Sequence, residues 1–170
     1  MTLIVDDCAD GAAVWPVYQA VFGDHGDFDA WREAVWDRHR GRAGFRVARA
    51  FEGDSLVGFA YGYTGEAGQW WTDTARAVLE PEVAEAWLGG HFEIVSLGVL
   101  PEARRAGLGR ALMVALTDGL DHERLLLMTT EEASDPARRL YASLGWQVVG
   151  RGIGDATVIM GKRTTASAAS

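Results

Sequence analysis

The sequence has few of the features that would place the protein outside the cell or in a membrane. Cys8 is its one cysteine, so no disulfide can form within the chain and no group of thiols is available to a metal ion. No apolar run approaches the roughly 18–20 residues that a membrane-spanning helix needs. The first residues carry neither a basic start nor a long apolar block, so we expect no secretory signal. We therefore predict a cytoplasmic protein without a membrane partner.

Positive charge is also scarce. The chain has 16 lysine and arginine residues against 24 aspartate and glutamate residues, which gives a formal net charge of −8 at pH 7. A protein whose task is to bind nucleic acid needs many cations to neutralise phosphates. Nucleic acid is therefore excluded as the expected partner.

The remaining composition is that of one globular domain. The 170 residues are 48% hydrophobic and 24% charged, and no linker, repeat or low-complexity block interrupts them before a small, polar C-terminal tail. We expect one domain over residues 1–163 and a flexible tail over 164–170. Seven tryptophans predict a large aromatic core, with an apolar cleft as the alternative for Trp70, Trp71 and Trp87.

Hydrophobic periodicity predicts a mixed α/β fold of the α+β type. Expected helices cover residues 12–22, 28–39, 70–79, 81–88, 106–120 and 136–144. Expected strands cover residues 3–5, 46–51, 56–63, 92–99, 125–129, 146–150 and 156–161. Helices and strands in this order predict a mixed α/β sheet, because a doubly wound sheet would alternate regularly.

The most informative segment is Val99-Leu100-Pro101-Glu102-Ala103-Arg104-Arg105-Ala106-Gly107-Leu108-Gly109-Arg110, which leaves a buried strand and enters a helix. Its glycines expose backbone N–H groups at the positive end of the helix dipole. Its three arginines add cations to an otherwise acidic protein. This combination predicts a binding site for a pyrophosphate.

Three kinds of phosphate-binding loop compete for this segment. A P-loop requires Gly-x-x-x-x-Gly-Lys-Ser/Thr, which the sequence lacks. A dinucleotide loop would need a third glycine where Leu112 stands, and it would follow the strand directly. A nucleotide-binding module therefore remains only as an alternative. The third pattern, Arg-x-x-Gly-x-Gly, is fulfilled by Arg104, Gly107 and Gly109.

With this third pattern the chain resembles the GNAT superfamily of N-acetyltransferases, whose motif A binds the pyrophosphate of acetyl-CoA. A second stretch, Asp135-Pro136-Ala137-Arg138-Arg139-Leu140-Tyr141-Ala142-Ser143-Leu144-Gly145-Trp146, resembles the motif B of that family. The resemblance covers residues 92–160. It implies a mixed, mostly antiparallel central sheet with helices on both faces and with parallel central strands that splay apart. Three positions depart from the family: Arg105 replaces a glycine, Ala106 a basic residue, and Ser134 an asparagine.

The resemblance also implies which residues form the site. Tyr141 would act as general acid toward the leaving thiolate, and Glu93 as general base toward the amine. The expected cofactor-binding residues are Leu97, Gly98, Val99, Arg104, Arg105, Ala106, Gly107, Leu108, Gly109, Arg110 and Ser134. For Tyr141 the alternative is packing, and for Glu93 it is a solvated position at the start of a strand.

Other polar candidates are weaker. His91 and Glu93 could share one face of a strand, but two ligands do not define a metal site, and we expect no metal. Glu131 and Glu132 could attract a cationic amine, although a solvated loop is the simpler interpretation. The remaining histidines, His25, His39 and His122, stand isolated in the sequence.

The resemblance predicts an acetyl-CoA-dependent N-acetyltransferase. Its acceptor would be a primary amine on a small molecule or a peptide, attacking acetyl-CoA directly without a covalent enzyme intermediate. A non-catalytic acyl-CoA-binding or sensor domain of the same fold is the alternative. A homodimer is left open, because dimers are common in the family.

Overall fold

A computed structural model describes residues 1–164, except for the side chains of Arg105 and Ala106. It divides into two compact units. The first contains Met1–Tyr63 and Ile94–Gly119, and the second contains Thr64–Glu93 and the chain from Leu120 onward. The prediction of a single domain over residues 1–163 stays a prediction.

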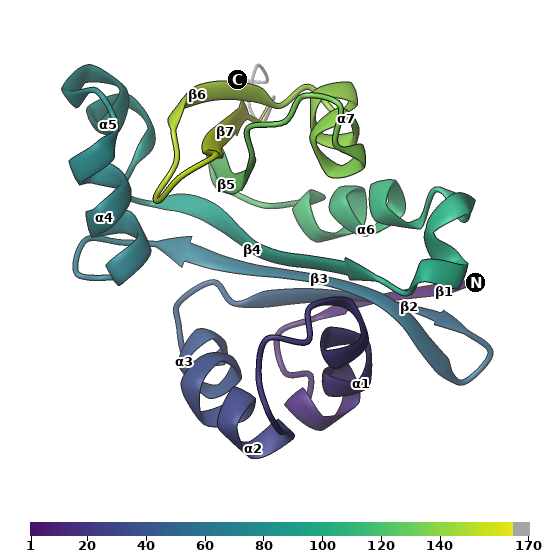
Figure 1. Cartoon of the computed structure of the whole chain (residues 1–170). Helices are drawn as coiled ribbons and strands as arrows, with labels where there is room; N and C mark the ends of the chain where they lie inside the picture. The colour runs from purple at the N-terminus through teal and green to yellow at the C-terminus, as the bar shows by residue number, and fades with distance from the viewer. Residues whose placement is uncertain (165–170) are drawn as a thin grey trace. The chain divides into compact units, whose positions relative to one another are not determined.

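One mixed sheet of seven strands has the order β1-β2-β3-β4-β5-β7-β6 (Figure 1). The strands are β1 (Thr2–Asp6), β2 (Arg46–Glu52), β3 (Ser55–Gly65), β4 (His91–Val99), β5 (Arg124–Thr130), β6 (Gln147–Arg151) and β7 (Thr157–Arg163). The described ladders are antiparallel, apart from β4 and β5, which run parallel. The predicted mixed, mostly antiparallel sheet is therefore confirmed.

The parallel ladder between β4 and β5 is short. It consists of Phe92 paired with Leu125 and Glu93 paired with Leu126. By contrast, β5 is paired with β7 along its whole length, from Arg124 to Thr130. A short ladder leaves backbone polar groups on a strand that can bind a ligand in place of a neighbouring strand.

The first unit packs helices on both faces of its strands. In Figure 1, helices α1 (Gly11–Val21), α2 (Phe28–Trp31) and α3 (Asp37–Arg40) lie on one face and α6 (Leu108–Thr117) on the other. The core beneath α1–α3 is rich in aromatic residues. Its buried members are Ala9, Val14, Val17, Tyr18, Trp31, Trp36, Phe45, Val47, Phe59, Tyr61 and Tyr63.

The helix predicted over residues 28–39 is interrupted by a π-helical turn, η1 (Arg32–Trp36). Residues five apart face different sides of an α-helix, whereas a turn closed by i→i+5 hydrogen bonds brings them to the same side. Trp31 and Trp36 are both buried in the core, and their ring centroids lie 5.4 Å apart. The wider turn thus lets both indoles pack inward.

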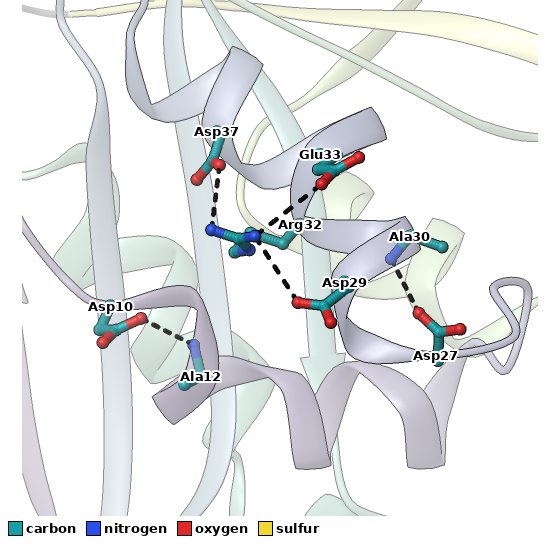
Figure 2. Close-up of polar contacts among 8 residues, drawn as sticks. All are labelled: Asp10, Ala12, Asp27, Asp29, Ala30, Arg32, Glu33 and Asp37. Carbon is teal, nitrogen blue, oxygen red and sulfur yellow. Dashed lines mark hydrogen bonds and ion pairs between the residues drawn. The ribbon is translucent and has the colours of Figure 1, made fainter.

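Acidic side chains organise the starts of these helices (Figure 2). Asp10 accepts from the Ala12 N–H at 3.0 Å, and Asp27 accepts from the Ala30 N–H at 2.9 Å. Asp27 is therefore the N-cap of the second helix. Outside the core, the guanidinium of Arg32 lies within 4.0 Å of the carboxylates of Asp29, Glu33 and Asp37.

The second unit has its own core. Helices α4 (Trp70–Val78) and α5 (Pro81–Trp87) pack on β5 and β7 through Ala75, Leu79, Ala84, Trp87, Leu88, Leu126 and Ile159. A Cβ at Gly161 would lie 2.6 Å from the Trp87 ring, so α5 approaches the sheet closely. Trp87 is therefore a core residue, whereas Trp70 is 68% exposed.

Helix α7 (Pro136–Ser143) begins as its sequence predicts. Asp135 accepts from the Ala137 and Arg138 N–H groups at 2.8 and 3.3 Å, and Pro136 occupies the first turn. Of the predicted tail, Thr164 donates to the backbone carbonyls of Glu123 and His122 at 3.0 and 2.8 Å. Residues 165–170 lie outside the described residues. No helix in the described chain is long and apolar enough to cross a bilayer.

His91, at the start of β4, is completely buried. Its Nδ1 accepts from the Gly89 N–H at 3.1 Å, which places the ring proton on Nε2. A Cβ on Gly65 would lie 2.1 Å from Nε2, so the imidazole fits only against a glycine. Burial, together with the positive charges of Arg124 and His122, lowers the pKa of His91 to about 4.

We expect this histidine to make the protein less stable in acid. In the unfolded chain the imidazole binds its proton near pH 6.5, whereas the folded protein takes it up only near pH 4. The contribution of neutral His91 to the free energy of unfolding is therefore complete above pH 6.5 and is lost as the pH falls toward 4. The loss amounts to about 3 kcal/mol at 1.36 kcal/mol per pKa unit.

Urea unfolding between pH 7 and pH 4 measures this effect in the wild type and in His91→Asn. The asparagine can accept the Gly89 hydrogen bond but does not titrate. Its free energy of unfolding should therefore change less over this pH range. An equal pH dependence in both proteins would contradict the assignment.

Candidate active site

The predicted pyrophosphate loop forms a left-handed turn between β4 and α6. After β4 ends at Val99, residues Pro101–Ala106 form a 3-10 turn, η2, and Gly107 follows with φ = 70°. This conformation is costly for a residue with a Cβ, so the glycine is required there. Helix α6 consequently begins at Leu108, two residues later than the periodicity predicts.

The N-terminus of α6 presents its first amides to a ligand. The N–H groups of Gly107, Leu108, Gly109 and Arg110 have no acceptor within the helix, because an α-helix pairs its amides only from the fifth residue onward. Gly107, at the N-cap position, has no side chain that could cap them. The Ala111 N–H, by contrast, already bonds to the Gly107 carbonyl at 3.1 Å. Four amides at the positive end of a helix form a suitable cradle for phosphate oxygens.

Arginines flank this cradle. Arg104 is exposed, and its Nε donates to the Val99 carbonyl at 3.1 Å, which ties the loop to the end of β4. Arg110 is exposed on the first turn of α6. The side chains of Arg105 and Ala106 lie outside the described residues. The effect of these two departures from the family pattern on phosphate binding therefore stays a prediction.

The end of β4 is closely packed at Gly98. A Cβ there would lie 2.9 Å from Phe59 and 3.4 Å from Phe22, both on the side of α1–α3. Val95, three residues earlier, packs on the same aromatic core. Residues three apart face opposite sides of a regular strand, so the alternation shifts by one between Val95 and Gly98. Such a shift is the pattern of a β-bulge, and it redirects the backbone polar groups of Leu97 and its neighbours.

The loop between α1 and α2 contains a group of side chains that sequence analysis missed. His25 is not isolated, because its Nδ1 lies 2.8 Å from the Asp24 carboxylate, which also accepts from the Tyr18 hydroxyl at 3.2 Å. Burial alone would raise the pKa of Asp24, but hydrogen bonds from His25 and Tyr18 lower it below its ordinary value. The adjacent Asp-His pair after a helix end was the available signal in the sequence.

Tyr141, the predicted general acid, lies on α7 in the second unit and is 8% exposed. Its ring packs near that of Trp146, with centroids 6.4 Å apart. Among the described residues, its hydroxyl has no hydrogen-bond partner. Burial, and then the negative charge of Asp135, raises the pKa of Tyr141 to about 12. The phenol therefore keeps its proton at neutral pH and can donate it.

Glu93, the predicted base, pairs with Leu126 in the parallel ladder and is 4% exposed. The alternative of a solvated carboxylate at the start of a strand is therefore wrong. His91 precedes it in β4, but no three His, Cys, Asp or Glu side chains of the described chain are grouped in a way that could hold a metal ion.

Ser134 lies in the exposed loop before α7. Its hydroxyl donates to the Glu132 carboxylate at 2.8 Å, and its N–H donates to the same oxygen at 3.1 Å. These two bonds lower the pKa of Glu132. A ligand that used the Ser134 hydroxyl as donor would have to replace the first bond, so this contact stays a prediction.

The two units thus hold different parts of the predicted site. The first unit brings the end of β4 and the glycine loop together, with the residues Leu97, Gly98, Val99, Arg104, Arg105, Ala106, Gly107, Leu108, Gly109 and Arg110. The second unit carries Glu93, Ser134 and Tyr141.

Comparisons with known proteins agree with this fold and these motifs. The model of the acetyltransferase (GNAT) family matches residues 12–146. A GCN5-like protein acetyltransferase of Mycobacterium tuberculosis is 39% identical over 104 residues, which are 57% of this chain and 50% of that protein. The chain therefore spans about half the length of that relative.

Two solved structures are similar over nearly their whole length. An acetyltransferase from Thermus thermophilus superposes with a TM-score of 0.68 at 16% identity, covering 96% of this chain and 98% of that one. The PaiA N-acetyltransferase of Thermoplasma acidophilum, solved with coenzyme A, gives 0.63 at 14% identity, covering 96% and 100%. At these identities the likeness shows the fold.

Proposed function

Because the chain belongs to the GNAT family of acetyltransferases, we propose that it transfers the acetyl group of acetyl-CoA directly to a primary amine. The observation that carries the proposal is the cradle of amides from Gly107 to Arg110, which follows the strand end at Val99 after the 3-10 turn η2. The PaiA enzyme, which has the same fold, is an N-acetyltransferase solved with coenzyme A. The acceptor would be a small molecule or a peptide with a free amine.

In this proposal the chain contributes three chemical functions. The amides of the cradle bind the pyrophosphate, with Arg104 and Arg110 as counter-charges. Backbone groups at Leu97–Val99 hold the thioester carbonyl and stabilise the negative charge that develops on its oxygen. Glu93, acting through a water molecule, accepts a proton from the acceptor nitrogen, and Tyr141 donates its proton to the leaving thiolate.

A panel of primary amines tests the proposal, with thiol release from acetyl-CoA as the measurement. Turnover with at least one amine is expected, together with a rise in melting temperature on adding acetyl-CoA but not ATP or NAD. Binding without turnover of any amine would support a non-catalytic acyl-CoA sensor. Protection by ATP or NAD alone would support a nucleotide-binding module.

Replacing Glu93 with glutamine tests the base. Glutamine keeps the shape of the side chain but cannot accept a proton, so kcat/KM should fall by about 10²-fold or more. The acidic limb of the pH profile should lose one ionisation, while the affinity for acetyl-CoA stays the same. If the variant keeps a near-normal rate and an unchanged acidic limb, Glu93 is not the base.

A further inference from the structure

The proposed function leaves open how long an acyl chain the site accepts. At the carbonyl carbon the C–S bond breaks and the C–N bond forms, while sulfur gains a proton and the amine loses one. These changes are the same for an acetyl group and for a longer acyl group. The protein can therefore distinguish them only by the space beside the carbonyl carbon, which borders the backbone at Leu97–Val99 in the proposed function.

Two phenylalanine rings close one side of this backbone. A Cβ on Gly98 would lie 2.9 Å from Phe59 and 3.4 Å from Phe22, so a single carbon atom on that side already meets both rings. Phe59 is completely buried in the aromatic core, whereas Phe22, at the C-cap of α1, is 42% exposed. Phe22 is therefore the ring that a ligand at Gly98 can reach from the solvent.

Helix α6 closes the opposite side. A Cβ on Gly58, in the neighbouring strand β3, would lie 3.0 Å from Leu112, 3.4 Å from Leu108 and 3.2 Å from the Gly98 carbonyl oxygen. Both leucines are at most 1% exposed, and α6 lies on the face of the sheet opposite to α1 (Figure 1). Of the side chains that cover these two glycines, the exposed one is therefore Phe22.

The position of the Phe22 ring is set by its neighbours. Its centroid lies 4.9 Å from that of Tyr18, which in turn lies 4.9 Å from that of Trp31 in the core. The Phe22 N–H donates to the Tyr18 carbonyl at 2.9 Å. Directly after Phe22 the chain turns at Gly23, with φ = 59°, and the Asp24 carboxylate accepts from the Tyr18 hydroxyl at 3.2 Å. These contacts anchor the ring to the core, so it can act as a wall of defined position.

We propose that Phe22 limits the length of the acyl group, so that the protein uses acetyl-CoA in preference to acyl-CoA donors with longer chains; this rests on the proposed function. The methyl of an acetyl group fits against the Phe22 ring. Each further methylene has to displace that ring from the position that Tyr18 gives it. One additional methylene in a pocket of fixed shape changes kcat/KM by about 10–200-fold. Phe22 is thus a specificity-determining residue and takes no part in proton transfer.

The test measures kcat/KM with acetyl-CoA, propionyl-CoA and butyryl-CoA, using one amine that wild type acetylates. In wild type, kcat/KM should fall by about 10-fold or more with each added methylene. In Phe22→Ala, the ratio of kcat/KM for butyryl-CoA to that for acetyl-CoA should rise by about 10-fold or more, because the truncated side chain leaves room for the longer chain. The ratio is the readout, since a general loss of folded enzyme lowers all three values together.

Two further variants separate specificity from packing. Phe22→Trp should act in the opposite direction, because the larger ring should lower the ratio of propionyl-CoA to acetyl-CoA below that of wild type. Phe28→Ala is the matched control: the Phe28 ring packs on the same aromatic core, with its centroid 6.1 Å from those of Trp15 and Trp31. The atoms nearest to a Cβ on Gly98 belong to other rings, so Phe28→Ala should keep the wild-type ratios.

The outcomes distinguish this inference from the proposed function. Wild-type ratios in both Phe22 variants would overturn the role of Phe22 and leave the acetyltransferase standing, as would a wild type that uses butyryl-CoA as well as acetyl-CoA. A changed KM for the amine with unchanged acyl ratios would also overturn it and would assign Phe22 to the acceptor. An equal change of ratio in Phe28→Ala would indicate a structural effect and overturn it too. If wild type transfers no acyl group to any amine, the proposed function itself fails and this inference falls with it.

Discussion

Replacing Tyr141 with phenylalanine should lower kcat by about 10²–10⁴-fold, the range expected for the loss of a positioned general acid. The side chain is buried, and its hydroxyl has no partner among the described residues, so removing that oxygen costs the fold little. The affinity for acetyl-CoA should stay the same. Single-turnover rates and a separate binding measurement with acetyl-CoA check the two parts of this expectation.

The nature of the leaving thiol makes this test more specific. A more acidic thiol needs less protonation as it departs, so Tyr141→Phe should lose less activity with an acyl donor of that kind. Burial raises the pKa of Tyr141 to about 12, so ionisation of this phenol should not produce a basic limb in the pH–rate profile below that pH.

Tyr63→Phe is the matched control for Tyr141. The Tyr63 hydroxyl accepts from Arg42, so this variant should lose stability and keep its kcat. Normal turnover in Tyr141→Phe would mean that the tyrosine only packs.

Replacing Gly109 with valine should abolish binding of acetyl-CoA. Gly109 is the second residue of α6 and contributes one of the four amides of the cradle, so a branched side chain there would keep phosphate oxygens away from the backbone. In wild type, acetyl-CoA at about 100 times its Kd should add roughly 2.7 kcal/mol to the stability of the folded protein. In the variant this stabilisation should disappear, which thermal melting with and without ligand measures.

Gly41→Val controls for the effect of valine in place of glycine. Gly41 follows α3 with φ = −76°, and a Cβ there would make only ordinary contacts, the nearest at 3.5 Å. This variant should keep the full melting shift with acetyl-CoA. A full shift in Gly109→Val as well would reject the assignment of the loop.

The parts of the site that follow from sequence are those that depend on neighbouring residues. Arg104, Gly107 and Gly109 mark a turn and a helix start, because only a glycine readily adopts the left-handed conformation found at Gly107. Tyr141 and Glu93 became candidates through the family resemblance and their positions on a helix and a strand. The sequence could not show that Glu93 is 4% exposed, because burial depends on how distant segments pack.

The pairing of Tyr18, Asp24 and His25 shows where prediction stopped. Asp24 and His25 are adjacent, but Tyr18 reaches the carboxylate only because α1 ends at Val21 and the chain turns back through Gly23, with φ = 59°. The contact between the rings of Tyr18 and Phe59 joins α1 to a strand more than 30 residues away in the sequence. Neither contact has a periodic signal.

The sequence by itself determined the order of helices and strands, the cap at Asp135 and the glycine turn before α6, because each depends on the conformational preferences of a few consecutive residues. The tertiary structure decided the rest. The π-helical turn at Arg32–Trp36 accompanies the burial of two indoles, and His91 becomes a poor base because distant residues enclose it. These properties arise from desolvation and close packing, which depend on residues far apart in the chain and so leave no local pattern.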